Sequence, residues 1–263
     1  MPQPIRRRRL SSQAAFLPPQ PANLQLWLDA GLGVFQDTAR TTPAVADTDP
    51  IGGWTDQSGK GNHASQATAG LRPVLKLSQI NGRPTVLWTA ASTQYLSANS
   101  AAAAFAGTNI PLTLITVMRY VTNSGQFSFT LASSVSANPR GEFYQNSTPR
   151  YNMSLIDDTA VNRLGIGATN PGTSPHIVSY MADGSNGQIW QDGASVVGPT
   201  AYASGAYTYN NLTLGGLVST TPVAGVYLNG HVAELLWWNV ALSAGEHQSV
   251  RAALATKYGI SST

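Results

Sequence analysis

The chain of 263 residues contains no cysteine, which excludes disulfides, thiolate zinc sites, iron–sulfur ligation and a cysteine nucleophile. Charged residues make up only 10% of the sequence, against roughly 25% in an ordinary soluble domain. No run approaches the roughly 18 to 20 continuous apolar residues of a membrane-spanning helix, so we expect no membrane partner. Without disulfides, the stability of the fold must come from packing. The length suits one large domain or two small ones.

Glutamate is scarce as well, since the sequence contains only Glu142, Glu234 and Glu246. General acid and base work on a glycosidic bond needs two carboxylates roughly 5 to 9.5 Å apart. Only a long-range pairing such as Glu142 with Glu234, or the neighbours Asp157 and Asp158, could supply them. The four histidines show no paired spacing suited to zinc. We therefore predict that the protein is not an enzyme, and we assign no catalytic residue and no cofactor.

The net charge of +3 is concentrated at the N-terminus. Arg6, Arg7, Arg8 and Arg9 carry four positive charges, so the rest of the chain is nearly neutral. A basic surface of the kind that coats nucleic acid is therefore absent, and we do not expect nucleic acid as a partner.

Residues 1–23 form an extended, basic and proline-rich arm with no capacity to build a core. A secretory signal would need an apolar stretch of roughly 7 to 15 residues after the charges, and none is present. The arm is interpreted either as a solvated tail or as an anchor, in which the arginines and Phe16 lie in a groove of a neighbouring subunit. A transit peptide and a weak nucleic-acid contact are lesser alternatives.

Residues 24–263 read as one domain of short strands separated by Gly, Pro, Asn, Ser and Thr clusters. Apolar and polar residues alternate in several runs, which is typical of half-buried strands, and many such strands predict a sandwich or barrel. The dipeptide Asp192-Gly193 predicts a two-residue hairpin turn. The expected strands are 24–29, 85–89, 112–121, 126–132, 141–145, 151–155, 176–182, 188–191, 194–197, 211–215 and 231–238.

One helix is predicted, at the C-terminal end. Ser243 with Glu246 three residues later forms a capping box, and Gly259 is placed for a left-handed C-terminal cap. Three apolar residues fall on one face between these caps: Val250, Leu254 and Tyr258. A shorter helical turn is expected at residues 100–105. In the run 235–238 both faces are apolar, so we expect that strand to be covered on each side, by a sheet and a helix or by another subunit.

Aromatic side chains that stack on sugar rings are the candidates for glycan contact. The segment 202–211 crowds three tyrosines into a Gly/Ser/Asn loop, and Tyr202, Tyr207, Tyr209 and Asn210 are the predicted contacts. The alternative is a loop clamped by its own tyrosines.

Calcium binds through loop oxygens, and Asp183 and Asn186 offer them, as does the segment 47–49. Turn formation explains these residues equally well.

Several motifs follow one another in a fixed order over residues 24–260: LWLDA (26–30), WTDQSGKGNHA (54–64), RP (72–73), NGRPTV (81–86), IVSY (177–180), WQDG (190–193), LGG (214–216), GHVAEL (230–235) and LS (242–243). Together they resemble the concanavalin A-like (LamG-like) jelly-roll superfamily. The resemblance implies an all-β, two-sheet antiparallel sandwich, often with glycan binding. The catalytic Glu-x-Asp-x-Glu spacing of its glycan-cleaving members is absent here.

With its short arm, the chain looks like virion structural proteins of tailed phages. We therefore predict a non-enzymatic virion component, a capsid decoration or a fibre or tail protein. It would be displayed on the virion surface in many copies, or as a homo-oligomer, and attached to other virion proteins by its arm. The alternative is a carbohydrate-binding module for cell-surface glycans, and a glycan-degrading enzyme is a lesser one.

Overall fold

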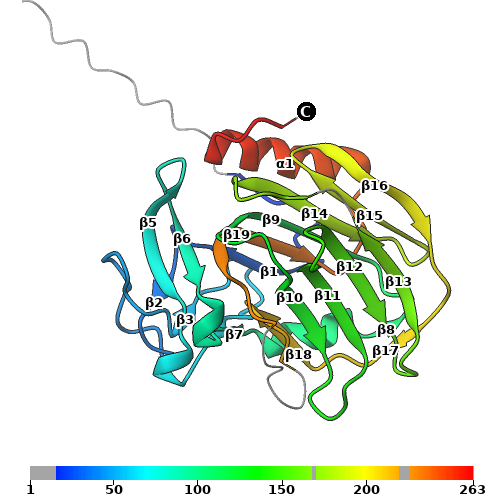
Figure 1. Ribbon diagram of the computed structural model, residues 1–263, viewed down its shortest axis with the longest axis horizontal. Coiled ribbons are helices and arrows are strands. Elements are labelled where there is room, and N and C mark those ends of the chain that lie inside the picture. The colour runs from blue at the N-terminus through cyan, green and yellow to red at the C-terminus, as the bar shows by residue number, and fades with distance from the viewer. Residues whose placement is uncertain (1–15, 168–169, 219–225, 263) are drawn as a thin grey trace, which may run out of the picture.

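A computed structural model describes residues 16–167, 170–218 and 226–262. Two antiparallel sheets form a sandwich, and one helix, α1 (Ala244–Tyr258), lies against the outer side of one sheet (Figure 1). The predicted fold class is confirmed. Arg6–Arg9 lie outside the described residues.

The first sheet has eight strands, and α1 covers part of its outer face. Its strands are, in spatial order, β16 (Ala194–Ala201), β15 (Asn186–Gln191), β14 (His176–Ala182), β9 (Leu112–Tyr120), β19 (Gly230–Trp238), β6 (Arg83–Trp88) and β5 (Val74–Ile80), with β1 (Leu24–Asp29) also paired to β19.

The second sheet has nine strands: β13 (Asn162–Gly167), β12 (Tyr151–Ile156), β11 (Arg140–Gln145), β10 (Gln126–Ala132), β18 (Asn211–Leu214), β7 (Leu96–Ser97), β4 (Ala64–Ser65), β3 (Gly53–Trp54) and β2 (Val34–Phe35). A separate pair joins β8 (Gly107–Thr108) to β17 (Ala206–Tyr207). Three 3-10 turns lie between strands: η1 (Ala69–Leu71), η2 (Ala90–Ser92) and η3 (Asn99–Phe105), the last confirming the turn expected at 100–105.

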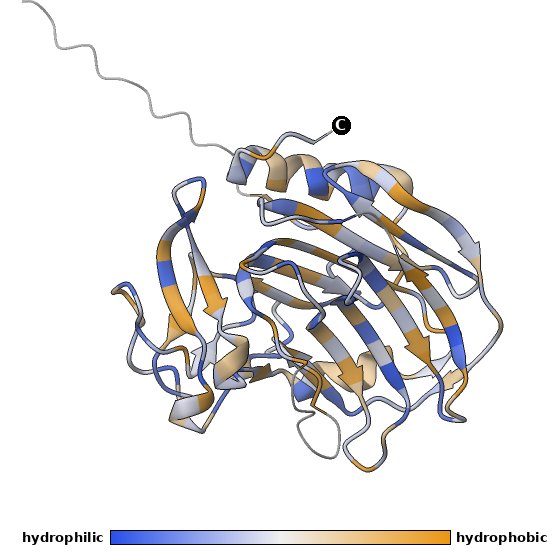
Figure 2. Ribbon diagram, viewed as in Figure 1, coloured by the Kyte–Doolittle hydropathy of each residue, from blue (hydrophilic) through white to orange (hydrophobic). Residues whose placement is uncertain are grey.

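The core has two layers, and β19 contributes to both. Leu235 and Trp237 point into the layer between the sheets, whereas Leu236 and Trp238 point into the layer under α1. The alternation follows from the two-residue period of a strand. The prediction that residues 235–238 are covered on both sides is confirmed, by the partner sheet and the helix. In strands of the nine-stranded sheet the same two-residue period appears as hydrophobic residues alternating with hydrophilic ones (Figure 2).

The local signals for α1 are confirmed. Ser243 and Glu246 form both hydrogen bonds of the capping box, and Gly259 ends the helix with a φ of 62°. Among the described residues, no helix is both long and apolar enough to span a membrane. The hairpin turn is confirmed too, because Asp192 and Gly193 have φ values of 50° and 92°.

The pairing of β19 changes along its length. Residues 230–232 pair with β6, whereas most of the strand from Glu234 onward pairs with β1. The edge of β19 thus passes from one neighbour to the other near Ala233, whose carbonyl accepts the amide of Ala30 at 2.8 Å. Side chains from three strands meet at this junction, and the last turn of α1 lies beside it.

Candidate functional site

A groove of 660 Å³ lies at this junction, which we call the α1–β1 groove. It combines an aromatic wall with several charged groups and the small side chains of α1. It is lined by Phe16, Trp27, Asp29, Leu32, Arg83, Glu234, Ala252, Ala253, Leu254, Thr256 and Lys257.

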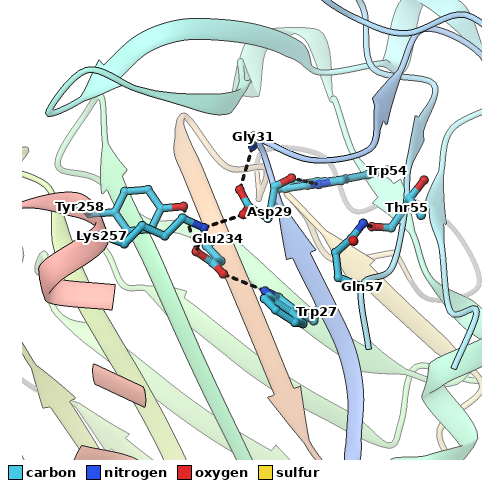
Figure 3. A network of polar contacts seen from close by, with 9 residues as sticks. All are labelled: Trp27, Asp29, Gly31, Trp54, Thr55, Gln57, Glu234, Lys257 and Tyr258. Atoms are coloured by element: carbon cyan, nitrogen blue, oxygen red, sulfur yellow. Dashed lines mark hydrogen bonds and ion pairs between the residues drawn. The ribbon is translucent and has the colours of Figure 1, made fainter. Parts of the chain in front are cut away.

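One ammonium group holds two buried carboxylates in the groove (Figure 3). Lys257 Nζ lies 2.5 Å from Asp29 Oδ2 and 2.7 Å from Glu234 Oε2. Tyr258 donates its hydroxyl to the same Glu234 oxygen at 2.9 Å, and Trp27 Nε1 donates to Glu234 Oε1 at 2.7 Å. The amide of Gly31 donates to Asp29 Oδ1. Every carboxylate oxygen of the pair therefore has a donor.

The electrostatics of this network follow from burial. Burial and the neighbouring charge of Asp29 raise the pKa of Glu234, and Lys257 only partly offsets them. Burial opposes the charged form of Lys257, yet Glu234 and Asp29 together raise the pKa of its ammonium group. One shared cation thus bridges the two carboxylates and ties the end of α1 to β1 and β19.

Other groups of the groove remain available to a ligand. An ammonium has three N–H donors, and Lys257 uses two of them on the carboxylates. Arg83 is exposed, and no hydrogen bond or ion pair joins its side chain to another described residue. The groove thus offers hydrogen-bond donors beside an indole ring.

The indole ring of Trp27 is held in place by contacts on two sides. Trp27 is half-buried, its backbone N–H donates to Asp56 Oδ1 at 2.9 Å, and its indole N–H is bound to Glu234. Phe16 meets the ring edge-on, with the ring centroids 6.3 Å apart. An aromatic ring fixed in this way loses little conformational entropy when a ligand stacks on it.

Known structures share this architecture. Domain 4 of AbnA, an extracellular arabinanase from Geobacillus stearothermophilus, solved in complex with arabinotriose, matches 86% of this chain and 96% of its own length, with a TM-score of 0.56 at 10% identity. The chain and this domain therefore share a β-sandwich fold. A scan of protein-family models and a search of curated proteins found no match.

Two sialidases contain a region of similar fold. NanB sialidase from Streptococcus pneumoniae aligns over 62% of this chain with a TM-score of 0.52 and 14% identity. A leech intramolecular trans-sialidase aligns over 92% with a TM-score of 0.50 and 14% identity. The chain spans about a quarter of the length of each of these proteins, 26% and 28%.

Two of the three predicted glycan-contacting tyrosines are buried. Tyr207 and Tyr209 are each only 2% exposed and stack on each other at 5.7 Å between ring centroids. The expectation of exposed rings is wrong for these two, because they close the interior as the clamped-loop alternative describes. Tyr202 is half-buried against the same core, and the Asn210 side chain accepts the amide of Ser134 at 2.6 Å.

Phe16, predicted to anchor the arm in a neighbouring subunit, packs on Trp27 of its own chain, and its contact with a neighbour stays a prediction. The segment that follows is tied to the same region, because Trp238 Nε1 donates to the carbonyl of Pro19 at 2.8 Å and Gln20 donates to Glu246. Anchoring through Arg6–Arg9 stays a prediction.

The predicted calcium ligands serve a turn. Asp183 Oδ1 accepts the backbone amides of Ser185 and Asn186, at 2.8 and 2.6 Å. In the segment 47–49, Asp47 pairs with Lys76. Across the described ranges, no group of three or more His, Asp or Glu side chains could hold a metal ion. Turn formation therefore accounts for these residues, and calcium binding stays a prediction.

The carboxylates weighed for catalysis have other partners in the structure. Glu142 lies on β11 of the nine-stranded sheet, whereas Glu234 lies on β19 of the other sheet. Burial raises the pKa of Glu142, which is paired with Arg140 at 3.0 Å. Asp157 is paired with Arg163 at 2.5 Å, and Asp158 accepts from Thr208.

The carboxylates that do meet, Asp29 and Glu234, were missed by reasoning from the sequence. The available signal was weak: an acidic residue at the end of a strand, a glutamate in an apolar strand and a lysine in the last turn of a helix. Only the fold brings these three together.

Proposed function

We propose that the protein is a non-catalytic carbohydrate-binding module and that its α1–β1 groove takes the glycan. The observation that carries the proposal is the half-exposed indole of Trp27, fixed by its bond to Glu234 and flanked by the free donors of Arg83 and Lys257. A sugar ring has an apolar face that stacks on an aromatic ring and hydroxyl oxygens that accept hydrogen bonds. The groove matches both.

The concanavalin A-like fold supports this proposal. AbnA domain 4, which aligns with 86% of the chain, was solved with arabinotriose. AbnA domain 4 is similar to this chain in fold, at 10% identity. The residues chosen for the binding test are therefore those of the α1–β1 groove, and not residues matched to the ligand contacts of AbnA.

We propose that the groove does not catalyse a reaction, because its two carboxylates are already bound to neighbouring side chains. A general acid must release a proton to the leaving group and a nucleophile must reach the anomeric carbon. Asp29 and Glu234 are both bound to Lys257, and Glu234 also accepts from Trp27 and Tyr258. Both carboxylates are therefore engaged in fixing the groove.

Display on a virion surface stays a separate prediction from the sequence. It rests on the resemblance to phage proteins and on Arg6–Arg9. The solved structures described above are bacterial and leech carbohydrate-active proteins, which favours glycan binding as the primary role. A virion protein that adheres to host glycans would combine the two.

The test is binding of the purified full chain to a glycan array that includes arabinotriose and 3′-sialyllactose, followed by calorimetry on retained glycans. Trp27→Ala should weaken binding about tenfold or more, as loss of a central aromatic anchor does. Trp27→Phe keeps a ring and should lose less. Phe127→Ala is the matched control, since Phe127 is a half-buried aromatic residue of β10 in the other sheet, outside the groove. Retention of no glycan by the parent chain, or equal affinity in Trp27→Ala, contradicts the proposal.

A further inference from the structure

Three polar side chains beneath α1 are buried without a partner. Arg251 is 8% exposed, His247 3% and Ser179 0%. Arg251 Nε and Nη1, His247 Nε2 and Ser179 Oγ are shielded from solvent and form no hydrogen bond with any described residue. Buried polar atoms are nearly always bonded, so four orphaned atoms in one region need an explanation.

These side chains belong to one cluster between α1 and the eight-stranded sheet. Ser179 on β14 lies opposite Trp190 on β15, and the Trp190 ring lies 4.5 Å from that of His247. His247 and Arg251 are four residues apart on α1 and so lie on neighbouring turns of one helix face. The cluster is separate from the α1–β1 groove, in which neither Arg251 nor His247 takes part.

The cluster carries one uncompensated positive charge. No carboxylate of the described residues forms an ion pair with Arg251. Another arginine of the protein, Arg72, shows the usual arrangement, since its three guanidinium nitrogens each donate to a backbone carbonyl. Burial and the charge of Arg251 lower the pKa of His247 to about 4, so the imidazole is neutral near pH 7. A buried charge without a counter-charge is strongly unfavourable.

We propose that this cluster binds a small oxyanion, such as phosphate, sulfate or a carboxylate. Arg251 offers two N–H groups, Ser179 a hydroxyl, and His247 an N–H in its Nε2 tautomer, so every orphaned atom can donate to an anion oxygen. Arg251 lines a pocket of 250 Å³ together with residues of α1 and Ser262, from which an anion would reach the guanidinium group. The ligand would supply the missing negative charge.

The test follows thermal unfolding of the full chain in a low-salt buffer while inorganic phosphate or, in a second series, sodium glucuronate is added. Ligand that binds only the folded state raises the unfolding temperature with concentration. Arg251→Met should abolish the increase, and in oxyanion-free buffer it should unfold no earlier than the parent, because the unpaired charge is gone. Arg150→Met, which removes an exposed arginine, should leave the increase unchanged.

Ser179→Ala tests the location from the side of the sheet. This small change should preserve the fold yet weaken phosphate binding about tenfold, as loss of a hydrogen bond to a charged group does. A response to phosphate alone identifies a free oxyanion as the ligand, and a response to both probes extends it to sugar carboxylates. The proposal is wrong if neither probe stabilises the parent chain, or if Arg251→Met or Ser179→Ala responds as the parent does.

Discussion

Replacing Lys257 by Met should destabilise the protein strongly. The ammonium is the shared partner of two buried carboxylates, whose side chains are only 6% and 1% exposed. Breaking a buried ion pair by removing one partner costs about 3–5 kcal/mol, since the remaining charge stays uncompensated. Lys257 itself is 32% exposed, and water can partly replace it, so we expect about 3 kcal/mol, measured by urea unfolding at pH 7.

The pH dependence of this loss has a definite sign. Burial and Asp29 already raise the pKa of Glu234 above its ordinary 4.5 in the folded protein, and removing Lys257 raises it further. A carboxyl group with a raised folded pKa favours the fold below 4.5 and loses that contribution as pH rises through the folded value. The difference between Lys257→Met and the parent should therefore shrink as pH is lowered from 8 to 5.

A second substitution separates charge from packing. In the double variant Lys257→Met, Glu234→Gln one of the two stranded charges is gone, so most of the lost stability should return, as a double-mutant cycle would show. A loss below about 1 kcal/mol, a loss that does not change with pH, or a double variant less stable than Lys257→Met would each refute the reasoning.

Three further predictions concern the scaffold. Gly215→Ala should lower the free energy of unfolding by more than about 3 kcal/mol. Gly215 has a φ of +89°, and a Cβ there would meet the Trp88 ring. A melting temperature equal to the parent's would contradict this. Ser243→Ala should cost about 1 kcal/mol through loss of the helix cap, measured by chemical denaturation, and no change would show that the capping box does not stabilise α1. His231 has its pKa lowered from 6.5 to about 4. Its contribution to the free energy of unfolding, about 3 kcal/mol, is therefore present above pH 6.5 and lost as pH falls toward 4. His231→Gln should flatten the plot of unfolding free energy against pH in that window, and a plot as steep as the parent's would count against the prediction.

The strands that the sequence predicted are those with a clear alternation or a sharp turn. The strands at 24–29, 126–132 and 176–182 match to the residue, and α1 matches at both caps. Local chemistry decides these elements: side-chain period, the Asp-Gly turn and the capping box. Two longer strands were missed. β5 has an irregular register with β6 after Lys76, and β13 is interrupted by Gly165 and Gly167, so neither has a clean period.

The candidate site was harder to predict because its members are local only in space. Tyr207 and Tyr209 looked like surface residues because small polar residues surround them, yet the loop turns both rings into the core. Lys257 lies in the last turn of α1. Its pairing with Asp29 across 228 positions depends on the change of strand partner along β19, for which no sequence signal exists.

The contacts at the junction on β19 also determine which part of the protein is completed last during folding. Trp27 and Glu234 are 207 residues apart, and Asp29 and Lys257 are 228 apart, so their contacts close nearly the longest loops that the chain can form. Contacts of such separation are slow to form. During synthesis the first strand must wait for β19 before it can pair, and the groove stays incomplete until the last turn of α1 has left the ribosome. A ligand of this groove would therefore recognise only chains that have finished folding.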